Sequence, residues 1–327
     1  MLRERVYISP DSGKPLSLSA DGEALLSGDG ERFPIGGGIA YLLPKHLEND
    51  VVKNREKEGW SVLVRRHNWL VTAEGIMALP AAGNDAYWGK VRDTLPMIDA
   101  ALGSLAGKLG LDLACGIGWA TAYFAQRGAR MIAADFNDTP QNGLGSAVLT
   151  RQKGLEFDAV CCDGENLPIA DNSLDFAFIC SALHHFTRPG ATLKEVFRCL
   201  KPGGVFLDIC ESYRTGIDDH QRESSYEQLV EFREAGINEL SYRESEYRAL
   251  FEQAGFAYSV YMPGWDHPDG PPSKAWENGE AGRAREGRPG WKQAIIRAAA
   301  ATPLIGIVRD QKLHRTVSNR VIVARKP

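Results

Sequence analysis

Apolar runs suited to buried strands alternate with helical patterns between residues 95 and 262, and this alternation constrains the fold more than any other feature. The runs are KLGLDLACG, ARMIAADF, FDAVCCDG, LDFAFICSAL and GGVFLDICES. Strands that are apolar on both faces are typical of parallel sheets covered by helices on each side. Together with AYSVYM and the terminal RVIVAR, they predict an α/β fold: a doubly wound, mostly parallel, seven-stranded Rossmann-like sheet.

The patterns divide the chain into three parts. Residues 1–44 alternate short apolar runs with Asp-Gly and Gly-Gly turn signals, which predicts a small β module. Residues 45–94 are first helical and polar and then rich in aromatic side chains, which predicts a connector that caps the next domain. Residues 95–327 form the doubly wound domain, with an insertion at 263–318 before its last strand.

Composition excludes some functions. The net charge of -4 over 327 residues gives no general electrostatic reason to bind nucleic acid or an anionic membrane. The first residues, MLRERVYISPDSG, lack the apolar centre of a secretion signal, and no run is long enough for a transmembrane helix, so we expect a cytoplasmic protein. Local anion recognition stays open, because the insertion is basic. Its basic residues are Arg283, Arg285, Arg288, Lys292, Arg297, Arg309, Lys312 and Arg315.

The six cysteines all lie in one central segment, and their spacing fits neither a zinc knuckle nor a disulfide scaffold. Reduced thiols in the core are therefore expected. No cysteine precedes Cys115, and we expect no metal site in this chain.

The stretch LDLACGIGWAT combines a strand end, a carboxylate, two glycines and the start of a helix. Gly116 and Gly118 let a ligand approach the backbone, and the helix near Trp119 directs free N–H groups toward it. A dinucleotide site would have a third small residue where this chain has Thr121, and Asp112 would repel a pyrophosphate. A nucleoside that carries an ammonium group and no phosphate fits better, and S-adenosylmethionine is such a ligand.

Acidic residues also end the next two strands. Asp135 ends ARMIAADF, where it can accept hydrogen bonds from ribose hydroxyls, and Asp163 follows FDAVCC, where it can accept from an adenine amino group. Parallel strands end at one edge of a sheet, so these acids are expected to converge with Asp112.

The stretches LDLACGIG, AADF, DGENLPIADNSLDFAFICSALHHF, LKPGG and ALFEQAGF, from about Leu109 to Met262, resemble class I S-adenosylmethionine-dependent methyltransferases, closest to the type 11 group. The resemblance implies S-adenosylmethionine as cofactor and S-adenosylhomocysteine as product. It assigns the methionine part, the ribose and the adenine to the three strand ends in turn. The implied cofactor-binding residues are Asp112, Gly116 and Gly118 (methionine part), Asp135 (ribose), Asp163, Gly164 and Glu165 (adenine), Ser181 (near the methionine end), and Ala114 and Phe136.

The N-terminal stretches SPDSGKPLSL and LLSGDGERFPIGGGIAYLLP are similar to the zinc-ribbon-like domain of the tRNA-methyltransferase activator family. That domain uses two Cys-x-x-Cys pairs, whereas this chain has Ser9 and Ser12 at the first pair and Leu26 and Asp29 near the second. Tetrahedral zinc needs thiolate or imidazole ligands, so a metal-free module is expected. Its core would consist of Leu16, Leu18, Leu25, Phe33, Ile35, Ile39 and Leu42.

Methyl transfer from a sulfonium mainly requires alignment and exclusion of water, and a base helps only where the acceptor loses a proton. His184 and His185 follow the fourth strand, where either ring could take that proton or simply pack beside the cofactor. Glu211 is interpreted as a polar residue at the rim of the crevice. Trp88 and Trp119 could wall the cofactor pocket or belong to the packing alone.

These features predict a biosynthetic methyltransferase with a small-molecule acceptor. Two alternatives stay open: an RNA base methyltransferase, suggested by the ribbon-like module and the basic insertion, and a cofactor-binding partner subunit without activity. No membrane span and no oligomeric state are predicted.

Overall fold

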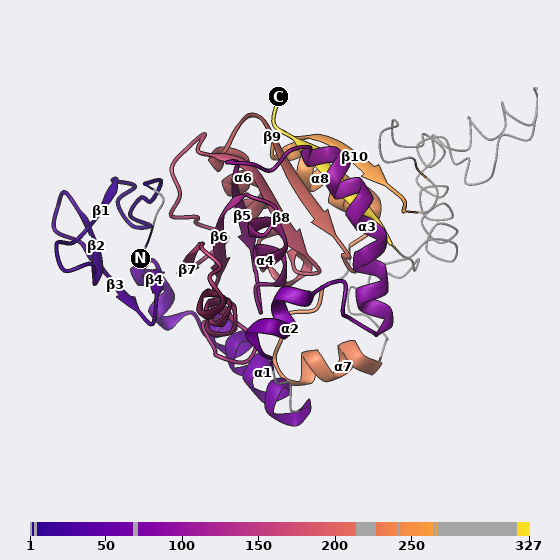
Figure 1. Ribbon diagram of the computed structural model, residues 1–327, viewed down its shortest axis with the longest axis horizontal. Helices are drawn as coiled ribbons and strands as arrows, with labels where there is room; N and C mark the ends of the chain where they lie inside the picture. The colour runs from indigo at the N-terminus through magenta and orange to yellow at the C-terminus, as the bar shows by residue number, and fades with distance from the viewer. Residues whose placement is uncertain are drawn as a thin grey trace, which may run out of the picture.

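The computed structural model describes residue 2 and residues 5–67, 71–213, 227–240, 242–263, 266 and 319–327. Its strands form one sheet in the order β1-β2-β3-β4-β7-β6-β5-β8-β9-β11-β10 (Figure 1). The basic residues of the insertion predicted at 263–318 lie outside the described residues, as does the apolar helix expected there.

Seven strands make up the predicted doubly wound sheet. They are β5 (Leu109–Leu113), β6 (Arg130–Asp135), β7 (Asp158–Cys162), β8 (Leu174–Cys180), β9 (Leu200–Ile209), β10 (Ala257–Tyr261) and β11 (Val321–Arg325). All pairs among the first five are parallel, and β11 lies antiparallel between β9 and β10. Every residue of β5 and β7 is buried, as expected for strands covered on both faces. The α/β fold class is confirmed.

The predicted count of seven strands is wrong, because the N-terminal strands continue the same sheet. They are β1 (Leu16–Leu18), β2 (Ala24–Ser27), β3 (Arg32–Gly36) and β4 (Ile39–Leu42). Strand β4 pairs in parallel with β7, with Ala40 opposite Val160. Without β4, the fully buried strand β7 would be an open edge, and covering such an edge avoids unpaired backbone groups. Turn signals could not reveal this pairing, because its partners are more than a hundred residues apart.

Helices cover both faces of the sheet. One face is covered by α2 (Ala73–Ala78), α3 (Ala86–Leu102), α4 (Trp119–Ala125), α5 (Leu144–Ala147) and the 3-10 helix η2 (Val148–Lys153). The other face is covered by α6 (Pro189–Cys199) and α8 (Glu244–Gln253). Below the carboxyl ends of the strands, as seen in Figure 1, α1 (Val51–His67) and α7 (Glu227–Glu234) lie against each other. Two short 3-10 helices, η1 (Lys45–Asn49) and η3 (Leu183–His185), complete the described elements.

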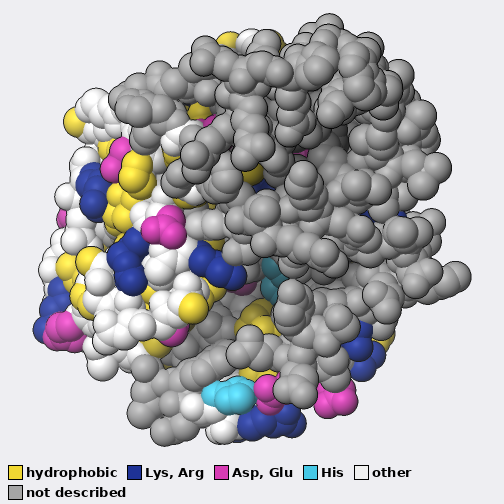
Figure 2. Space-filling view, turned by 90° about the vertical axis from the view of Figure 1, so that its right-hand side faces the viewer, with side chains coloured by type: hydrophobic (Ala, Val, Ile, Leu, Met, Phe, Trp, Pro, Cys, Tyr) yellow, Lys and Arg dark blue, Asp and Glu magenta, His cyan; other side chains and the backbone are white. Residues whose placement is uncertain are grey.

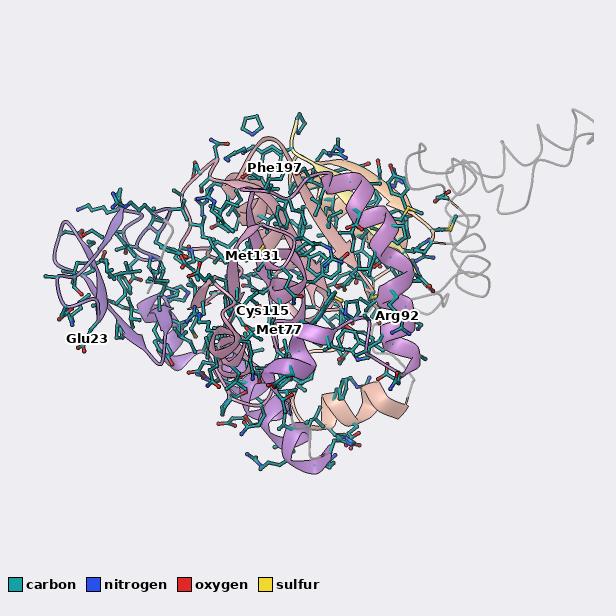
Figure 3. The ribbon with its side chains drawn as sticks, in the orientation of Figure 1. Glu23, Met77, Arg92, Cys115, Met131 and Phe197 are labelled. Carbon is teal, nitrogen blue, oxygen red and sulfur yellow. The ribbon has the colours of Figure 1, made fainter. Side chains whose placement is uncertain are left out.

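The predicted core of the N-terminal strands is largely buried. Leu25, Phe33, Ile39 and Leu42 are buried, whereas Leu18 is 38% exposed, which corrects its assignment to the core. The remaining two, Leu16 and Ile35, are partly buried. Figure 3 shows Glu23 at the outer tip of this region, away from Met131 and Cys115 in the central layers. Strand β4 is therefore largely buried where it pairs with the main sheet, whereas β1 at the far end is partly exposed.

Four of the six cysteines, Cys115, Cys161, Cys162 and Cys199, are buried, and the other two are partly exposed.

Among the described helices, none has the length and apolar character needed to cross a membrane.

Replacing Leu42 by Ala should lower the free energy of unfolding by about 2 to 5 kcal/mol, because a fully buried leucine at the joint between β4 and β7 leaves a cavity. Leu18→Ala is the matched control and should cost clearly less, about 1 kcal/mol or below, because that side chain is 38% exposed on a terminal strand. Denaturant unfolding followed by circular dichroism measures both. Equal losses would show that β1 is as well packed as β4.

Candidate functional site

A cavity of about 780 Å³ opens at the carboxyl ends of β5, β6, β7 and β8, on the side where α1 lies. Its volume is in the range of sites for small molecules. The strand order reverses between β5 and β8, which is where open α/β sheets bind ligands. All of the predicted site residues except Gly118 line this cavity. They are Asp112, Ala114, Gly116, Asp135, Phe136, Asp163, Gly164, Glu165, Ser181, His184 and His185.

The backbone bends sharply where three strands enter the cavity. Ala114 follows β5, Ser181 follows β8 and Cys210 follows β9, and each has a positive φ, at 52°, 53° and 58°. Non-glycine residues adopt this conformation at a cost, which is typically tolerated at functional sites. The bends turn the chain away from the sheet and leave its edge open to a ligand.

The two glycines of the first turn have different roles. A Cβ at Gly116 would meet nothing within 4 Å, so the backbone there is open to the cavity. At Gly118, with φ of 79°, a Cβ would lie 2.5 Å from the Cβ of Ala147. Gly118 therefore allows α4 to begin close against α5. It was predicted to contact the ligand, but it does not line the cavity.

Asp112 is held by Thr121, the residue that stands where a dinucleotide-binding site would have a third small residue. Its Oδ2 accepts hydrogen bonds from the Thr121 backbone N–H at 2.8 Å and from the Thr121 hydroxyl at 2.6 Å. The carboxylate thus joins β5 to the first turn of α4. Burial raises the pKa of Asp112 to about 7, against the opposing effect of the bonds from Thr121. A cationic ligand group would restore the charged form.

Asp135 fastens the glycine turn to the end of β6. One carboxylate oxygen accepts from the Gly116 N–H and the other from the Asn137 N–H, both at 2.8 Å. Burial raises the pKa of Asp135 to about 6, although these bonds oppose the shift.

Asp163 lies beside a lysine that sequence reasoning missed. Its Oδ2 is 2.6 Å from the Lys53 Nζ, and its Oδ1 accepts from the Glu165 N–H at 3.0 Å. Lys53 is also 3.4 Å from the Glu165 carboxylate. Because a carboxylate offers about four lone-pair positions, Asp163 can still accept from a ligand amino group, now shared with Lys53.

Helix α1 supplies one wall of the cavity through Lys53, Glu56, Lys57 and Trp60. These residues have the i, i+3, i+4 and i+7 spacing of a single helix face. The sequence therefore contained the pattern of a helix face with charged and aromatic side chains, in a segment that was interpreted only as a connector. Lys57 pairs with Asp138 at 2.5 Å, which ties the helix to the loop after β6. Burial, together with the charges of Asp135 and Glu239, raises the pKa of Glu56 to about 8.

Aromatic side chains form much of the remaining wall. Trp88 and Trp119 both line the cavity, with ring centroids 5.5 Å apart in an edge-to-face contact. The ring centroids of Trp60 and Phe232, which also line the cavity, lie 5.6 Å apart. The cavity therefore combines buried charges at the strand ends with flat apolar walls, which is typical of small-molecule sites.

His184 and His185 differ in protonation. His184 is buried between two carboxylates, with Nδ1 at 2.7 Å from Glu211 and Nε2 at 3.4 Å from Glu239. Burial alone would lower the pKa of His184, but these carboxylates raise it to about 10. Burial and the neighbouring His184 lower the pKa of His185 to about 4. Of the two predicted bases, His185 therefore has the unprotonated ring at neutral pH.

Glu211 is a buried anchor, which corrects its interpretation as a rim residue. It is 6% exposed and accepts hydrogen bonds from the backbone N–H groups of Ala182 and Leu183 and from the Tyr247 hydroxyl. These bonds fix η3 and hence His184. The strand pattern could not show this, because the partners come from the turn after β8 and from α8.

Comparisons with known proteins match the part of the chain that contains the predicted site residues from Asp112 to His185. The family described as "Methyltransferase domain" matches residues 111–208, the segment that runs from within β5 through β6, β7 and β8 to most of β9. The demethylmenaquinone methyltransferases of Clavibacter sepedonicus and Corynebacterium kroppenstedtii are 37% and 36% identical over 41% and 39% of this chain. The chain spans half the length of each of these two relatives. The demethylmenaquinone methyltransferase of Thermobifida fusca is 29% identical over 60% of this chain and 80% of its own length.

Asp112→Asn should change how stability depends on pH. The folded protein holds the Asp112 proton up to about pH 7, whereas the unfolded chain loses it near 3.8, so the wild type loses stability as pH rises through this window. Asparagine does not titrate. The free energy of unfolding of the wild type relative to Asp112→Asn should therefore fall by at least about 1 kcal/mol between pH 4 and 7.

Denaturant titrations at a series of pH values measure this difference. Asp93→Asn, at an exposed position on α3, is the control and should show no such trend. A difference that is independent of pH would mean that Asp112 is ionised throughout.

Proposed function

We propose that this protein is an S-adenosylmethionine-dependent methyltransferase with a small-molecule acceptor. The observation that carries the proposal is the meeting of Asp112, Asp135 and Asp163 with the open turn at Gly116 in one cavity, inside the segment that matches a methyltransferase domain. Product formation would release S-adenosylhomocysteine.

The chemistry of the cavity fits this cofactor. The buried carboxylate of Asp112 would take the ammonium group of the methionine part, and Asp135 would take the ribose hydroxyls. Asp163 and the backbone at Gly164 and Glu165 would hold the adenine, with Lys53 nearby. Ser181, at the bend after β8, would lie near the methionine end. The volume of about 780 Å³ leaves room for a second molecule beside the cofactor.

The aromatic walls support an acceptor with a flat, apolar part. Trp60, Trp88 and Phe232 offer ring faces and edges, which bind planar molecules through dispersion and edge-to-face contacts. The relatives at 37% and 36% identity are named for demethylmenaquinone, which motivates testing ring compounds of this kind first.

The bound cofactor supplies an activated methyl group. An electron pair of the acceptor forms the new bond to that methyl as the sulfur–methyl bond breaks, and the acceptor loses a proton where it carries one. The cavity aligns the two molecules and its aromatic walls exclude water, which accounts for most of the rate. Of the two predicted bases, His185, whose ring is unprotonated at neutral pH, is the group that would accept this proton, with His184 beside it.

The N-terminal strands form, in this proposal, a metal-free relative of the ribbon domain that stabilises the catalytic sheet. The Ser9 hydroxyl, at one former ligand position, accepts from the N–H groups of Asp11 and Ser12. The Ser12 hydroxyl donates to Glu31 at 2.7 Å. Hydrogen bonds thus take the place of a metal in holding these turns together.

Residence in the cytoplasm stays a prediction.

The RNA alternative gains no support from the described residues on the face that Figure 2 shows. On the face shown in Figure 2, the described Lys and Arg side chains are interspersed with Asp and Glu side chains. The partner-subunit alternative would require the cavity to bind the cofactor without turnover.

Asp135→Ala should weaken S-adenosylmethionine binding by at least about tenfold, because it removes a charged acceptor for two hydroxyls. Asp93→Ala, at an exposed position on α3 that does not line the cavity, is the matched control and should leave the affinity unchanged. Isothermal titration calorimetry measures both affinities. Equal affinity of the wild type and Asp135→Ala would refute the assignment of the ribose.

Turnover is tested by incubating the protein with methyl-labelled S-adenosylmethionine and an extract of its source cells. We expect label in small molecules, and quinol-type aromatic compounds are the first candidates for identification. Label in RNA would establish the first alternative. Cofactor binding without label in any fraction, together with a stoichiometric partner, would establish the second.

A further inference from the structure

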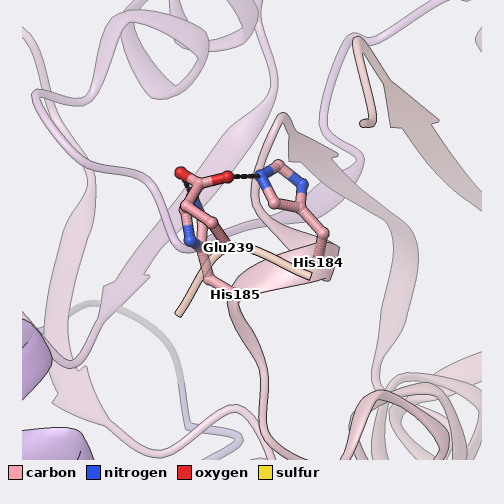
Figure 4. A group of neighbouring side chains, drawn as sticks. All are labelled: His184, His185 and Glu239. Carbon is pink, nitrogen blue, oxygen red and sulfur yellow. Dashed lines mark ion pairs between the residues drawn. The ribbon is translucent and has the colours of Figure 1, made fainter. Parts of the chain in front are cut away.

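We propose that His184, His185 and Glu239 form a binding site for a divalent transition-metal ion of the zinc class. The three side chains line the same cavity as the strand-end acids, and Figure 4 shows both imidazoles reaching toward the Glu239 carboxylate. The sequence did not predict this site, because Glu239 lies more than fifty residues after the two adjacent histidines.

The distances between the three groups suit one ion. The His184 Nε2 lies 3.4 Å from one oxygen of Glu239, and the His185 Nε2 lies 3.8 Å from the other. One ligand atom from each residue lies within 4.8 Å of the others. Bonds of about 2.0 to 2.2 Å to a tetrahedral ion place neighbouring ligand atoms about 3.4 Å apart. The separations of 3.4 and 3.8 Å are close to this value, and the widest separation among the three ligand atoms, at most 4.8 Å, would have to contract by no more than about 1.4 Å.

The other nitrogen of each ring is already engaged by an acceptor. His184 Nδ1 bonds Glu211 at 2.7 Å, and His185 Nδ1 bonds the carbonyl oxygen of Asn238 at 2.6 Å. Metal-binding histidines typically donate their second N–H to a carboxylate or a backbone carbonyl, which fixes the tautomer and aims the free nitrogen at the ion. Both rings of this pair show that arrangement, and the Nε2 atoms of both rings face Glu239. The Nε2 of His184 carries a proton in the metal-free protein, so an ion that binds there would release that proton.

Hydrogen bonds do not account for the approach of His185 to Glu239. Because a carbonyl oxygen only accepts, Nδ1 of His185 carries its proton, and Nε2 of the neutral ring presents a lone pair to a carboxylate oxygen. Their separation of 3.8 Å is also beyond hydrogen-bond range. A cation between them would satisfy both groups.

The ligands are held in place before any ion arrives. Asn238 accepts from His185 through its carbonyl and donates its side-chain amide to the His185 carbonyl at 2.7 Å. The Leu240 N–H donates to the His184 carbonyl. The segment that carries Glu239 is therefore tied to η3 on both sides of the ligand, and metal sites need such support.

The surrounding charge also favours a cation. Glu211 contacts His184 from the end of β9, so its charge adds to that of Glu239. Glu56 of α1 lies 3.7 Å from His185, and its raised pKa leaves it largely protonated at neutral pH, so it would add charge only once an ion lowers that pKa. The nearby Lys53 is paired with Asp163 and Glu165. Two imidazoles and a carboxylate select zinc-class ions over calcium or magnesium, and sites of this composition often keep an open position. If the proposed function holds, that position would take an oxygen of the acceptor.

The test uses the full chain, stripped with a chelator and titrated with Co²⁺ as a spectroscopic substitute for Zn²⁺. We expect one Co²⁺ per chain, with visible absorption bands of a four- or five-coordinate ion. Glu239→Gln, which keeps the shape of the side chain, and His185→Gln should each weaken binding by at least about tenfold. His46→Gln, at an exposed position on η1, is the matched control and should leave the titration unchanged.

Absence of Co²⁺ binding by the wild type would overturn the proposal, and so would binding that both cavity variants retain. Charge-transfer bands from thiolate would place the ion at cysteines instead and would equally overturn it. Thermal melting followed by circular dichroism verifies folding, and the isosteric Glu239→Gln keeps the test decisive if His185→Gln fails to fold. Affinity for S-adenosylmethionine is measured separately, so failure of the metal site and failure of the proposed function give different results.

Discussion

Buried carboxylates at the ends of parallel strands are the constraint on which the site depends. Burial of a charge is costly unless donors surround it, and each strand-end acid has found a different donor. Asp112 uses Thr121, Asp135 uses the backbone of the glycine turn, and Asp163 uses Lys53. The donors belong to α4, to the turn after β5 and to α1. The acids therefore hold together the elements that enclose the cavity, in addition to any ligand they bind.

Helix α1 shows how a connector becomes part of the site. Its lysines pair with Asp163 and Asp138, while Glu56 and Trp60 face the cavity. The helix begins soon after β4, which is itself paired with β7. Pairing of the N-terminal strands with the main sheet thus places α1 across the carboxyl ends of the strands. A role for the N-terminal region in forming the cavity follows from the topology, independently of any metal in that region.

The histidine pair depends on two more distant segments. Glu211, after β9, fixes the backbone and one ring of η3, and the segment after α7 brings Glu239 and Asn238 to the other side. A group of opposite charges held this firmly in an enclosed cavity is suited either to moving a proton or to binding an ion. The group lies in the cavity together with Ser181, which follows the end of β8.

The sequence by itself determined the doubly wound sheet, because strands that are apolar on both faces can be stable only between helix layers. It also determined which residues meet at the cavity, from Asp112 to His185, because parallel strands end at one edge. It could not predict that β4 extends the sheet, that Leu18 is exposed, or that Gly118 serves packing against Ala147. Nor could it pair Lys53 with Asp163, Glu211 with His184, or Glu239 with both histidines. These contacts join segments far apart in the chain, and local periodicity carries no information about them; only the tertiary structure, in which β4, α1 and the segment after α7 pack around the same edge of the sheet, decided them.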